Sequence, residues 1–302
     1  MAPIKLQMGP IEWALVLTLS ALWGGSFLFN ALALEDLPPL TVVLGRVGFA
    51  AIALQIILHA MGYRFPPLAA CWPFLVMGLL NNAIPFTAIV AGQTQISSGL
   101  ASILNATTPL FAVTLAHFLT TDEKLTTLRI IGVVLGIIGV TIMIGPAALG
   151  GMNGALWGQI AILIASIAYS FASIFGKRFR GIPPIVIAAG QLTGSTLIMI
   201  PLVLVIDQPW TLPMPGAVAF GSVLLLALMS SALAYIIYFQ ILARAGATNL
   251  MLVTFIIPPM AVLAGVLVLN ETVQTHELLG FAMIALGLAV IDGRLFRKRP
   301  QV

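Results

Sequence analysis

The sequence predicts an all-α integral membrane protein of about ten transmembrane helices, arranged as two inverted five-helix repeats around a central cavity. Three observations predict this fold. The first is composition, because 60% of the 302 residues are hydrophobic and only 7% are charged, whereas a soluble domain carries about 25% charged residues. The second is a series of charge-free runs long enough to cross a bilayer. The third is a set of short motifs that recur in the same order in both halves.

The charge-free runs divide the chain into spans, because each crossing of a bilayer needs about 17–25 apolar residues. The run Trp13–Leu34 fits one span, whereas Phe65–Thr121 and Ile130–Gly176 are each long enough for two. Turn-forming stretches at 93–99 and 145–154 divide these two long runs. The predicted spans are 11–33, 39–61, 68–91, 97–119, 128–146, 154–176, 183–205, 216–241, 247–269 and 276–293. The loops that remain are too short for a soluble domain.

Basic residues fall on one side of the membrane in this arrangement. That side carries every Lys and Arg residue except Arg46, which lies within a span. The other side carries acidic residues, namely Glu35, Asp36, Asp207, Glu271 and Glu277. The positive-inside rule then places both termini in the cytoplasm. The sequence pI of about 9.6 therefore reflects topology, and we expect membrane lipid, not nucleic acid, as the surrounding partner.

Matching motifs divide the chain into residues 1–150 and 151–302. The stretch EDLPPLTVV at 35–43 resembles RGIPPIVIA at 180–188, and LLNNAIPF at 79–86 matches LMSSALAY at 228–235. A later set has identical internal spacing in both halves: Glu123, Gly132 and Gly139, then Glu271, Gly280 and Gly287. Because each half holds five spans, the second half enters the membrane from the opposite side. Inverted repeats are a common plan for secondary transporters, with the substrate at the repeat interface.

Four segments carry a resemblance to a known family. They are ALWGGSF (21–27), LPPLTVVLGRVGFA (37–50), NATTPLFAVTLAHFLTTDE (105–123) and IIPPMAVLAGVLVLNE (256–271). In this order, over nearly the whole chain, they resemble the drug/metabolite transporter superfamily, in particular its EamA-type members and, within these, the YddG-type amino-acid exporters. The resemblance implies ten helices, with the fifth and tenth outside the cavity. It also implies export of aromatic or other neutral amino acids across the bacterial cytoplasmic membrane.

Polar side chains on two matching spans mark candidate substrate-binding positions. Asn82 and Pro85 share a helix face at the spacing i, i+3, and Ser231, Tyr235 and Tyr238 form a similar stripe. These residues form either a polar wall of the cavity or hydrogen-bonded contacts between helices. We predict that Asn82 faces the cavity, whereas its neighbour Asn81 faces another helix. Because Ala234 replaces Pro85 in the second half, only the first of the two helices is expected to bend.

Aromatic and amide side chains on other spans extend this prediction. Trp23 and Tyr169 lie mid-span and are expected to stack on an apolar or aromatic substrate, the alternative being ordinary packing. Asn105 lies beside Pro109, which removes a backbone donor from its helix. Pro109, and Pro258 and Pro259 in the matching span, are expected to interrupt their helices. Together with Pro85 they are predicted to form a hinge or gate, the alternative being a static kink.

Arg46 is the one basic residue inside a span. It is a possible contact for a substrate carboxylate, but a long basic side chain near a span end more often reaches outward or caps helix carbonyls, and we weight this structural role more heavily. No carboxylate lies in the middle of any predicted span, so we predict transport or exchange down a substrate gradient, without strict proton coupling. Glu123 and Glu271 are expected to act as helix caps or loop anchors.

Other function classes fit the sequence less well. An intramembrane enzyme is disfavoured, because the chain contains no HExxH, Gly-x-Ser-x-Gly or paired intramembrane aspartates. A single cysteine, Cys71, excludes an intrachain disulfide or a cysteine metal cluster, and we expect no cofactor or metal. A multidrug or other metabolite exporter of the same fold, and a channel, stay as alternatives to an amino-acid carrier. We expect a monomer with a small-molecule substrate.

Overall fold

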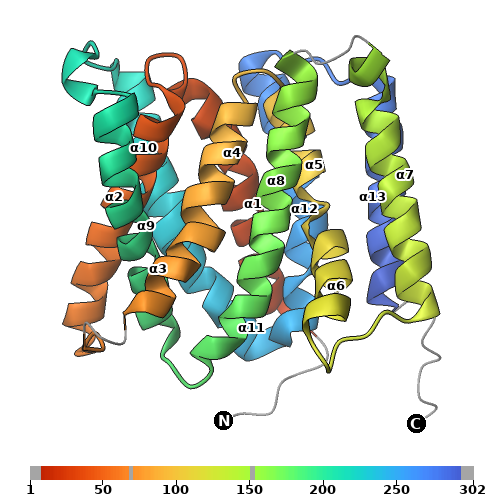
Figure 1. Ribbon diagram of the computed structural model, residues 1–302, viewed down its shortest axis with the longest axis horizontal. Helices are drawn as coiled ribbons and strands as arrows, with labels where there is room; N and C mark the ends of the chain where they lie inside the picture. The colour runs from red at the N-terminus through yellow and green to blue at the C-terminus, as the bar shows by residue number, and fades with distance from the viewer. Residues whose placement is uncertain (1–7, 68–70, 150–153, 294–302) are drawn as a thin grey trace.

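A computed structural model describes residues 8–67, 71–149 and 154–293, and within these ranges helices joined by loops are present and no strand occurs. Ten segments are long and apolar enough to cross a membrane, as the sequence predicted (Figure 1). Their bounds lie within a few residues of the predicted ones: Pro10–Ala33, Pro39–Ala60, Trp72–Gly92, Ser98–Leu119, Thr127–Gly145, Gly154–Phe179, Pro184–Ile206, Ala217–Gly246, Leu252–Leu269 and Thr275–Asp292.

Several spans consist of more than one helical segment. The elements of the first half are α1 (Pro10–Ala33), α2 (Pro39–Ala60), α3 (Trp72–Gly78), η2 (Leu79–Ala83), α4 (Ile84–Gly92), α5 (Ser98–Asn105), α6 (Thr108–Leu119) and α7 (Thr127–Leu149). Those of the second half are α8 (Gly154–Phe175), η3 (Gly176–Phe179), α9 (Pro184–Ile206), η4 (Pro209–Thr211), α10 (Ala217–Ala227), η5 (Leu228–Leu233), α11 (Ala234–Leu250), α12 (Leu252–Leu269) and α13 (Thr275–Asp292).

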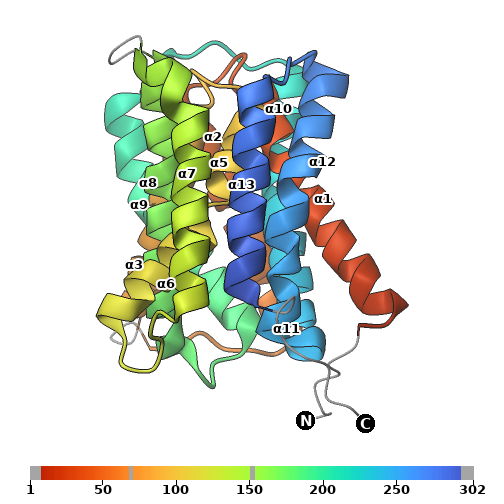
Figure 2. The same cartoon turned by 90° about the vertical axis from the view of Figure 1, so that its right-hand side faces the viewer.

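The two halves run in opposite directions through the bundle. In Figure 1, α1 rises from the lower edge, whereas α8 descends from the upper edge. The start of α1 and the end of α13 therefore lie at the same edge, as Figures 1 and 2 both show. The predicted boundary between the halves, at residues 150 and 151, lies outside the described residues.

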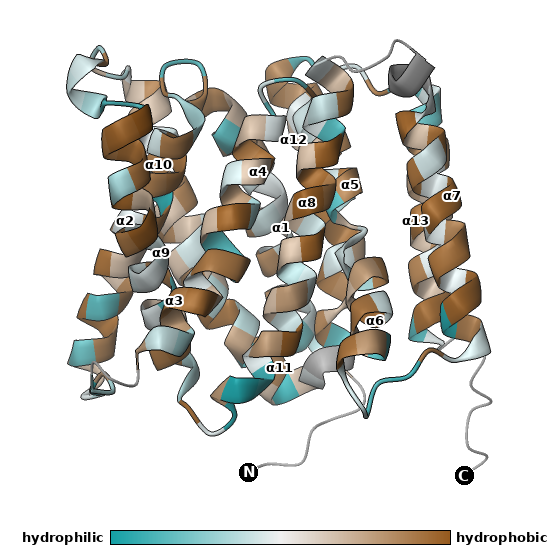
Figure 3. Cartoon of the chain, viewed as in Figure 1, coloured by the Kyte–Doolittle hydropathy of each residue, from teal (hydrophilic) through white to brown (hydrophobic). Residues whose placement is uncertain are grey.

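The fifth and tenth spans, α7 and α13, form a separate pair at the periphery, as the family resemblance implied (Figures 1 and 2). A Cβ on Gly132 would lie 2.5 Å from the carbonyl oxygen of Gly287, and one on Gly139 would lie 2.7 Å from that of Gly280. The glycines repeated in the sequence thus allow the two backbones to touch. Both helices are strongly hydrophobic along most of their length (Figure 3), which suits an environment of lipid.

A π-helical turn interrupts the same position in each half. In the first half it is η2, of sequence LLNNA, and in the second it is η5, of sequence LMSSAL. The prediction that only the proline-containing helix bends stays a prediction, but both helices are irregular at this position, and η5 has no proline. A π-turn adds a residue to the helix and commonly marks a functional site. The paired irregularity also rotates the side chains that follow it, which changes the predicted cavity wall.

Candidate functional site

A cavity of about 570 Å³ lies between the two halves. It extends from Asn30, near the upper end of α1, to Arg180, which follows η3 at the lower edge. Five of the predicted substrate-binding residues line it: Trp23, Asn105, Tyr169, Tyr235 and Tyr238. The other two, Asn82 and Ser231, are buried behind its wall. The described residues contain no group of three His, Cys, Asp or Glu side chains that could hold a metal ion.

Arg46 lines this cavity, contrary to the expectation that it reaches outward. The residue is only 5% exposed, and its Nε donates to Ser231 Oγ at 3.0 Å. Its guanidinium carbon lies 3.7 Å from the centroid of the Phe86 ring, which is a cation–π contact. The side chain turns inward because η5 supplies an acceptor and α4 supplies an aromatic face. The structure therefore presents a buried cation to whatever occupies the cavity.

The two adjacent asparagines have exchanged the roles that the sequence predicted. Asn81 lines the cavity, and its Nδ2 donates to Gln191 Oε1 and to Tyr235 Oη, at 3.1 and 3.0 Å. Asn82 is fully buried and donates to the same Tyr235 oxygen at 3.0 Å. The prediction was wrong because it assumed a regular α-helix, whereas η2 shifts the helical register. Ser230 and Ser231 show the same exchange, since Ser230 lines the cavity.

This difference gives a direct prediction. Asn81→Leu is expected to weaken substrate transport, because it removes a polar group from the cavity wall. Loss of its interaction with substrate is expected to cost about 1–2 kcal/mol of binding free energy, which is about 5- to 30-fold in apparent substrate affinity. The apparent substrate affinity of Asn82→Leu is expected to stay within about threefold of the wild-type value. This substitution removes one hydrogen bond, but it also removes the buried Oδ1 atom, which has no partner. Concentration-dependent uptake into vesicles measures both. A larger effect at Asn82 than at Asn81 would contradict this assignment.

Contacts between the halves follow the repeat. Arg46 on α2 contacts η5 at Ser231, whereas Gln191 on α9 contacts η2 at Asn81. Arg46 and Gln191 occupy matching positions of the two repeats, and so do the two π-turns. The contact of Arg46 with Ser231 includes a positive charge, whereas the contact of Gln191 with Asn81 is between neutral groups. The two halves therefore place chemically different groups at equivalent positions of one cavity.

Aromatic side chains form the other part of the wall. The Trp23 and Tyr238 rings lie 5.8 Å apart between centroids, so Trp23 packs on α11 and presents its remaining surface to the cavity. Trp23, Tyr169, Tyr235 and Tyr238 surround a space with few charges. Such a pocket suits a small amphipathic molecule. Their roles as substrate contacts stay predictions.

Two asparagines that line the cavity, Asn30 and Asn105, each have a side-chain oxygen with no hydrogen-bond partner among the described residues. The Asn30 side chain is held by its amide nitrogen, since Nδ2 donates to Gln93 Oε1 at 2.9 Å, and Gln93 donates to the Phe27 carbonyl at 2.9 Å. A buried acceptor without a donor costs about 1–3 kcal/mol. Both oxygens are enclosed by protein atoms, so neither is open to the cavity in this conformation.

The predicted hinges differ between the halves. The span that contains Pro109 is broken between Asn105 and Thr108, and hydroxyl groups of α8 and α6 satisfy the freed carbonyls. Ser170 Oγ donates to the Thr108 carbonyl at 3.0 Å, and Thr108 Oγ1 to the Asn105 carbonyl at 2.8 Å. By contrast, α12 continues through Pro258 and Pro259. The prediction that these two prolines interrupt their helix is wrong, because α12 is one helix with both prolines inside it. Their role as a hinge or gate stays a prediction. Pro85 lies buried at the start of α4, behind the cavity wall.

Three carboxylates join the two halves at the upper edge. Asp207 accepts from the backbone and hydroxyl of Thr41, both at 2.8 Å. Asp36 accepts from the Gly216 amide at 2.7 Å. Glu271 accepts from the amide of Ser98 at 2.7 Å and from its hydroxyl at 2.8 Å. Glu271 is therefore a helix cap, as expected. These contacts hold the first half against the second at this edge.

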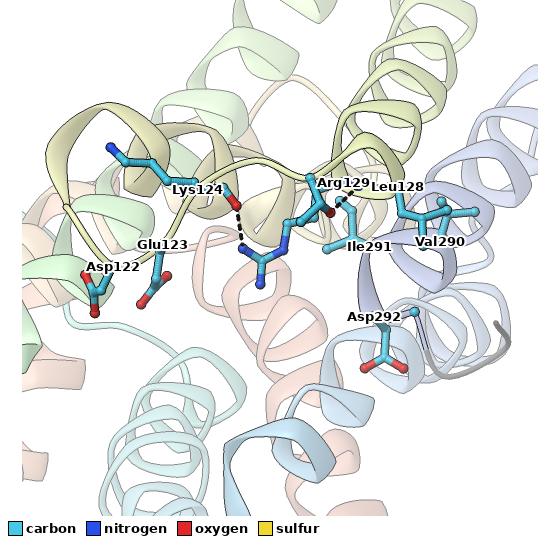
Figure 4. A pocket seen from close by; sticks show the side chains of 10 residues that line it. Asp122, Glu123, Lys124, Leu128, Arg129, Val290, Ile291 and Asp292 are labelled. Atoms are coloured by element: carbon cyan, nitrogen blue, oxygen red, sulfur yellow. Dashed lines mark hydrogen bonds between the residues drawn. The ribbon is translucent and has the colours of Figure 1, made fainter. Parts of the chain in front are cut away.

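A second cavity, of about 390 Å³, lies at the lower edge between the loop after α6 and the end of α13 (Figure 4). Arg129 Nη1 donates to the Lys124 carbonyl at 3.2 Å, and Lys124 Nζ donates to the His117 and Thr120 carbonyls. Lys177 pairs with Glu123 at 2.8 Å, so Glu123 is a loop anchor, as expected. A hydrogen bond from Lys177 also lowers the pKa of Asp122. These interactions fasten the loop and leave the central cavity as the candidate site.

Comparisons with known proteins agree with this arrangement. The model of the EamA-like transporter family matches residues 11–145 and again 156–292. The "Uncharacterized inner membrane transporter YedA" of Escherichia coli (strain K12) is 29% identical over 303 residues, covering 98% of this chain and 95% of that protein. The "Uncharacterized transporter YoaV" of Bacillus subtilis (strain 168) is 23% identical, covering 94% of this chain and 96% of that protein.

Two further similarities concern function and fold. The "Probable terminal-alkyne amino-acid exporter" of Streptantibioticus cattleyicolor is 23% identical and covers 98% of both chains. One solved crystal structure matches with a TM-score of 0.67 at 18% identity, covering 96% of this chain and 99% of that chain. The latter shows that the fold, with its two halves, occurs in a solved structure.

Proposed function

The chain belongs to the EamA-like transporter family, and we propose that it is a secondary carrier that exports small neutral or amphipathic metabolites by alternating access. Neutral and aromatic amino acids, the substrates implied by the resemblance to YddG-type exporters, are its proposed main substrates. The site of action is a bacterial cytoplasmic membrane, which the inner-membrane name of a relative and the ten apolar spans support. We expect the carrier to act as a monomer.

The observation that carries this proposal is the composition of the central cavity. Its wall combines eight aromatic residues with amides, hydroxyls and one buried arginine. A small amphipathic substrate meets apolar surface and a few fixed polar groups in such a pocket. The relative named as a probable exporter of an amino acid supports the same substrate class.

Alternating access is supported by the relation between the halves. The first helices of the two halves enter from opposite edges. Each half also contains a π-turn, and the two π-turns lie at matching positions. We propose that the halves form an inverted repeat with both termini in the cytoplasm. In that proposed orientation the upper edge, which the carboxylates join, is the closed, outer side, and the cavity opens toward the cytoplasm near Arg180. Exchange of conformation between the halves then opens the opposite edge.

The test is uptake by the purified protein in liposomes. Labelled phenylalanine is expected to enter saturably and to be competed by neutral amino acids, but not by sugars or organic cations. Trp23→Ala, which removes an aromatic side chain from the cavity, is expected to reduce uptake at low concentration at least about tenfold. Trp157→Ala is the control, because Trp157 is exposed on the bundle surface. Uptake that never saturates indicates a channel, and competition by organic cations alone indicates a multidrug carrier.

A further inference from the structure

The charge of Arg46 has no counterpart anywhere in the cavity. The chain contains nine carboxylate side chains, and none of them lines the cavity. The salt bridges of the described residues involve only Lys177 and Arg244. The ionisable groups that act on Arg46 are the phenols of Tyr169 and Tyr235, which are neutral at physiological pH. A second cation, Arg180, lies at the cytoplasmic mouth, so the empty cavity is purely cationic.

The neighbours of Arg46 hold its side chain but do not neutralise it. Ser231 accepts one of the five N–H donors of the guanidinium, and the Phe86 ring covers one face. The other donors have no hydrogen-bond partner among the described residues. Tyr235 accepts hydrogen bonds from both Asn81 and Asn82, so its hydroxyl hydrogen is free to point elsewhere. Several donors at this end of the cavity are thus available to an anion.

A substrate carboxylate supplies the complementary group. Its two oxygens accept hydrogen bonds from guanidinium donors, and its charge neutralises that of Arg46. A zwitterionic amino acid bound with its carboxylate at Arg46 therefore satisfies donors that the empty protein leaves unsatisfied.

Alternating access changes the cost of this charge. The carrier must pass through a state in which the cavity is closed to both sides and water is largely excluded. Burying an uncompensated charge is strongly unfavourable, whereas a hydrogen-bonded pair offsets much of that cost. The loaded carrier can therefore close around a neutral ion pair, but the empty carrier must close around a bare guanidinium.

Resting on the proposed function, we propose that Arg46 makes this protein an exchanger, because its cavity closes readily only when a substrate carboxylate neutralises the guanidinium. Outward movement of one amino acid is then coupled to inward movement of another carboxylate-bearing molecule. The coupling requires no proton and no intramembrane carboxylate. A carrier without this charge returns empty and catalyses net transport.

The experiment compares exchange with net uptake in proteoliposomes. Labelled phenylalanine is expected to enter vesicles preloaded with unlabelled phenylalanine at least about tenfold faster than empty vesicles. Preloading with 3-phenylpropionate, which keeps the carboxylate, is expected to stimulate entry. Preloading with phenethylamine, which lacks it, is expected to leave entry at the rate of empty vesicles. Equal rates into preloaded and empty vesicles would overturn the proposal, and so would stimulation by the amine.

Substitutions then assign the effect to Arg46. At saturating substrate, Arg46→Gln is expected to bring the ratio of exchange to net uptake close to one, whereas Arg46→Lys keeps it high with weaker apparent affinity. Arg178→Gln is the matched control, because Arg178 is an exposed arginine near the same edge that does not line the cavity, and its ratio is expected to be that of the wild type. A high ratio in Arg46→Gln overturns the assignment. If that variant is inactive, the preloading series in the wild type decides alone. Absence of any phenylalanine transport refutes the proposed function instead.

Discussion

Replacing Gly24 with leucine is expected to abolish the folded carrier, because this glycine lies where the backbones of α1 and α12 meet. A Cβ at this position would lie 2.7 Å from Met260 Cβ and 3.0 Å from the carbonyl oxygen of Ile257. Backbone atoms cannot move aside as a side chain can. Even Gly24→Ala is expected to cost about 1–3 kcal/mol from overpacking, which outweighs the gain of about 1 kcal/mol that alanine gives a helix.

The neighbouring residue supplies the control. A Cβ on Gly25 would meet only the Phe29 ring, at 3.7 Å, which is an ordinary van der Waals contact. Gly25→Ala is therefore expected to leave stability unchanged or to raise it slightly. Thermal unfolding in detergent, followed by the loss of the monodisperse peak in size-exclusion chromatography, measures all three variants. Equal loss of stability in Gly24→Ala and Gly25→Ala would show that the close approach of α1 and α12 is not the cause.

The pattern of charge and hydropathy predicted most of the fold. Charge-free runs located ten spans to within a few residues, because exposing charged groups to lipid is costly and spans are therefore bounded by charges or turns. The glycines that recur at matching positions also gained a structural meaning, since Gly132 and Gly139 allow α7 to touch α13. Such features depend on local composition, which a single sequence reports directly.

Side-chain direction was less predictable for physical reasons. A π-turn has no periodic signature in sequence, so the sequence did not predict that η2 turns Asn81 to the cavity in place of Asn82, or that η5 turns Ser230 there in place of Ser231. The only available signal was a pair of adjacent polar residues at the same place in both halves. The direction of Arg46 depended on Ser231, 185 positions away along the chain, and no local pattern encodes such a partner. The prolines of α12 showed the converse, since a local helix breaker was overridden by its surroundings.

The upper closure depends most on Glu271, which links the second half to the N-terminus of α5. Its two carboxylate oxygens accept from the Ser98 amide, the Ser98 hydroxyl and the Gly99 amide, at 2.7, 2.8 and 3.1 Å. The positive end of the helix dipole adds to these charge-assisted bonds. Glu271→Gln removes the charge and one acceptor oxygen, so it is expected to destabilise the closed upper edge by about 1–3 kcal/mol. The population open on that side then rises about 5- to 150-fold.

Labelling from outside the membrane measures this shift. Ser102 lies one helical turn below the Glu271 contact and lines the cavity, so a Ser102→Cys side chain, in a Cys71→Ser background, reports access from the upper edge. Glu271→Gln is expected to speed its reaction with a membrane-impermeant thiol reagent. Glu277→Gln is the matched control, because Glu277 belongs to the same loop region but, among the residues that the structure describes, accepts only from the Gln274 amide at its own helix start. If both variants speed labelling equally, the loop has merely loosened, and Glu271 does not hold the two halves together.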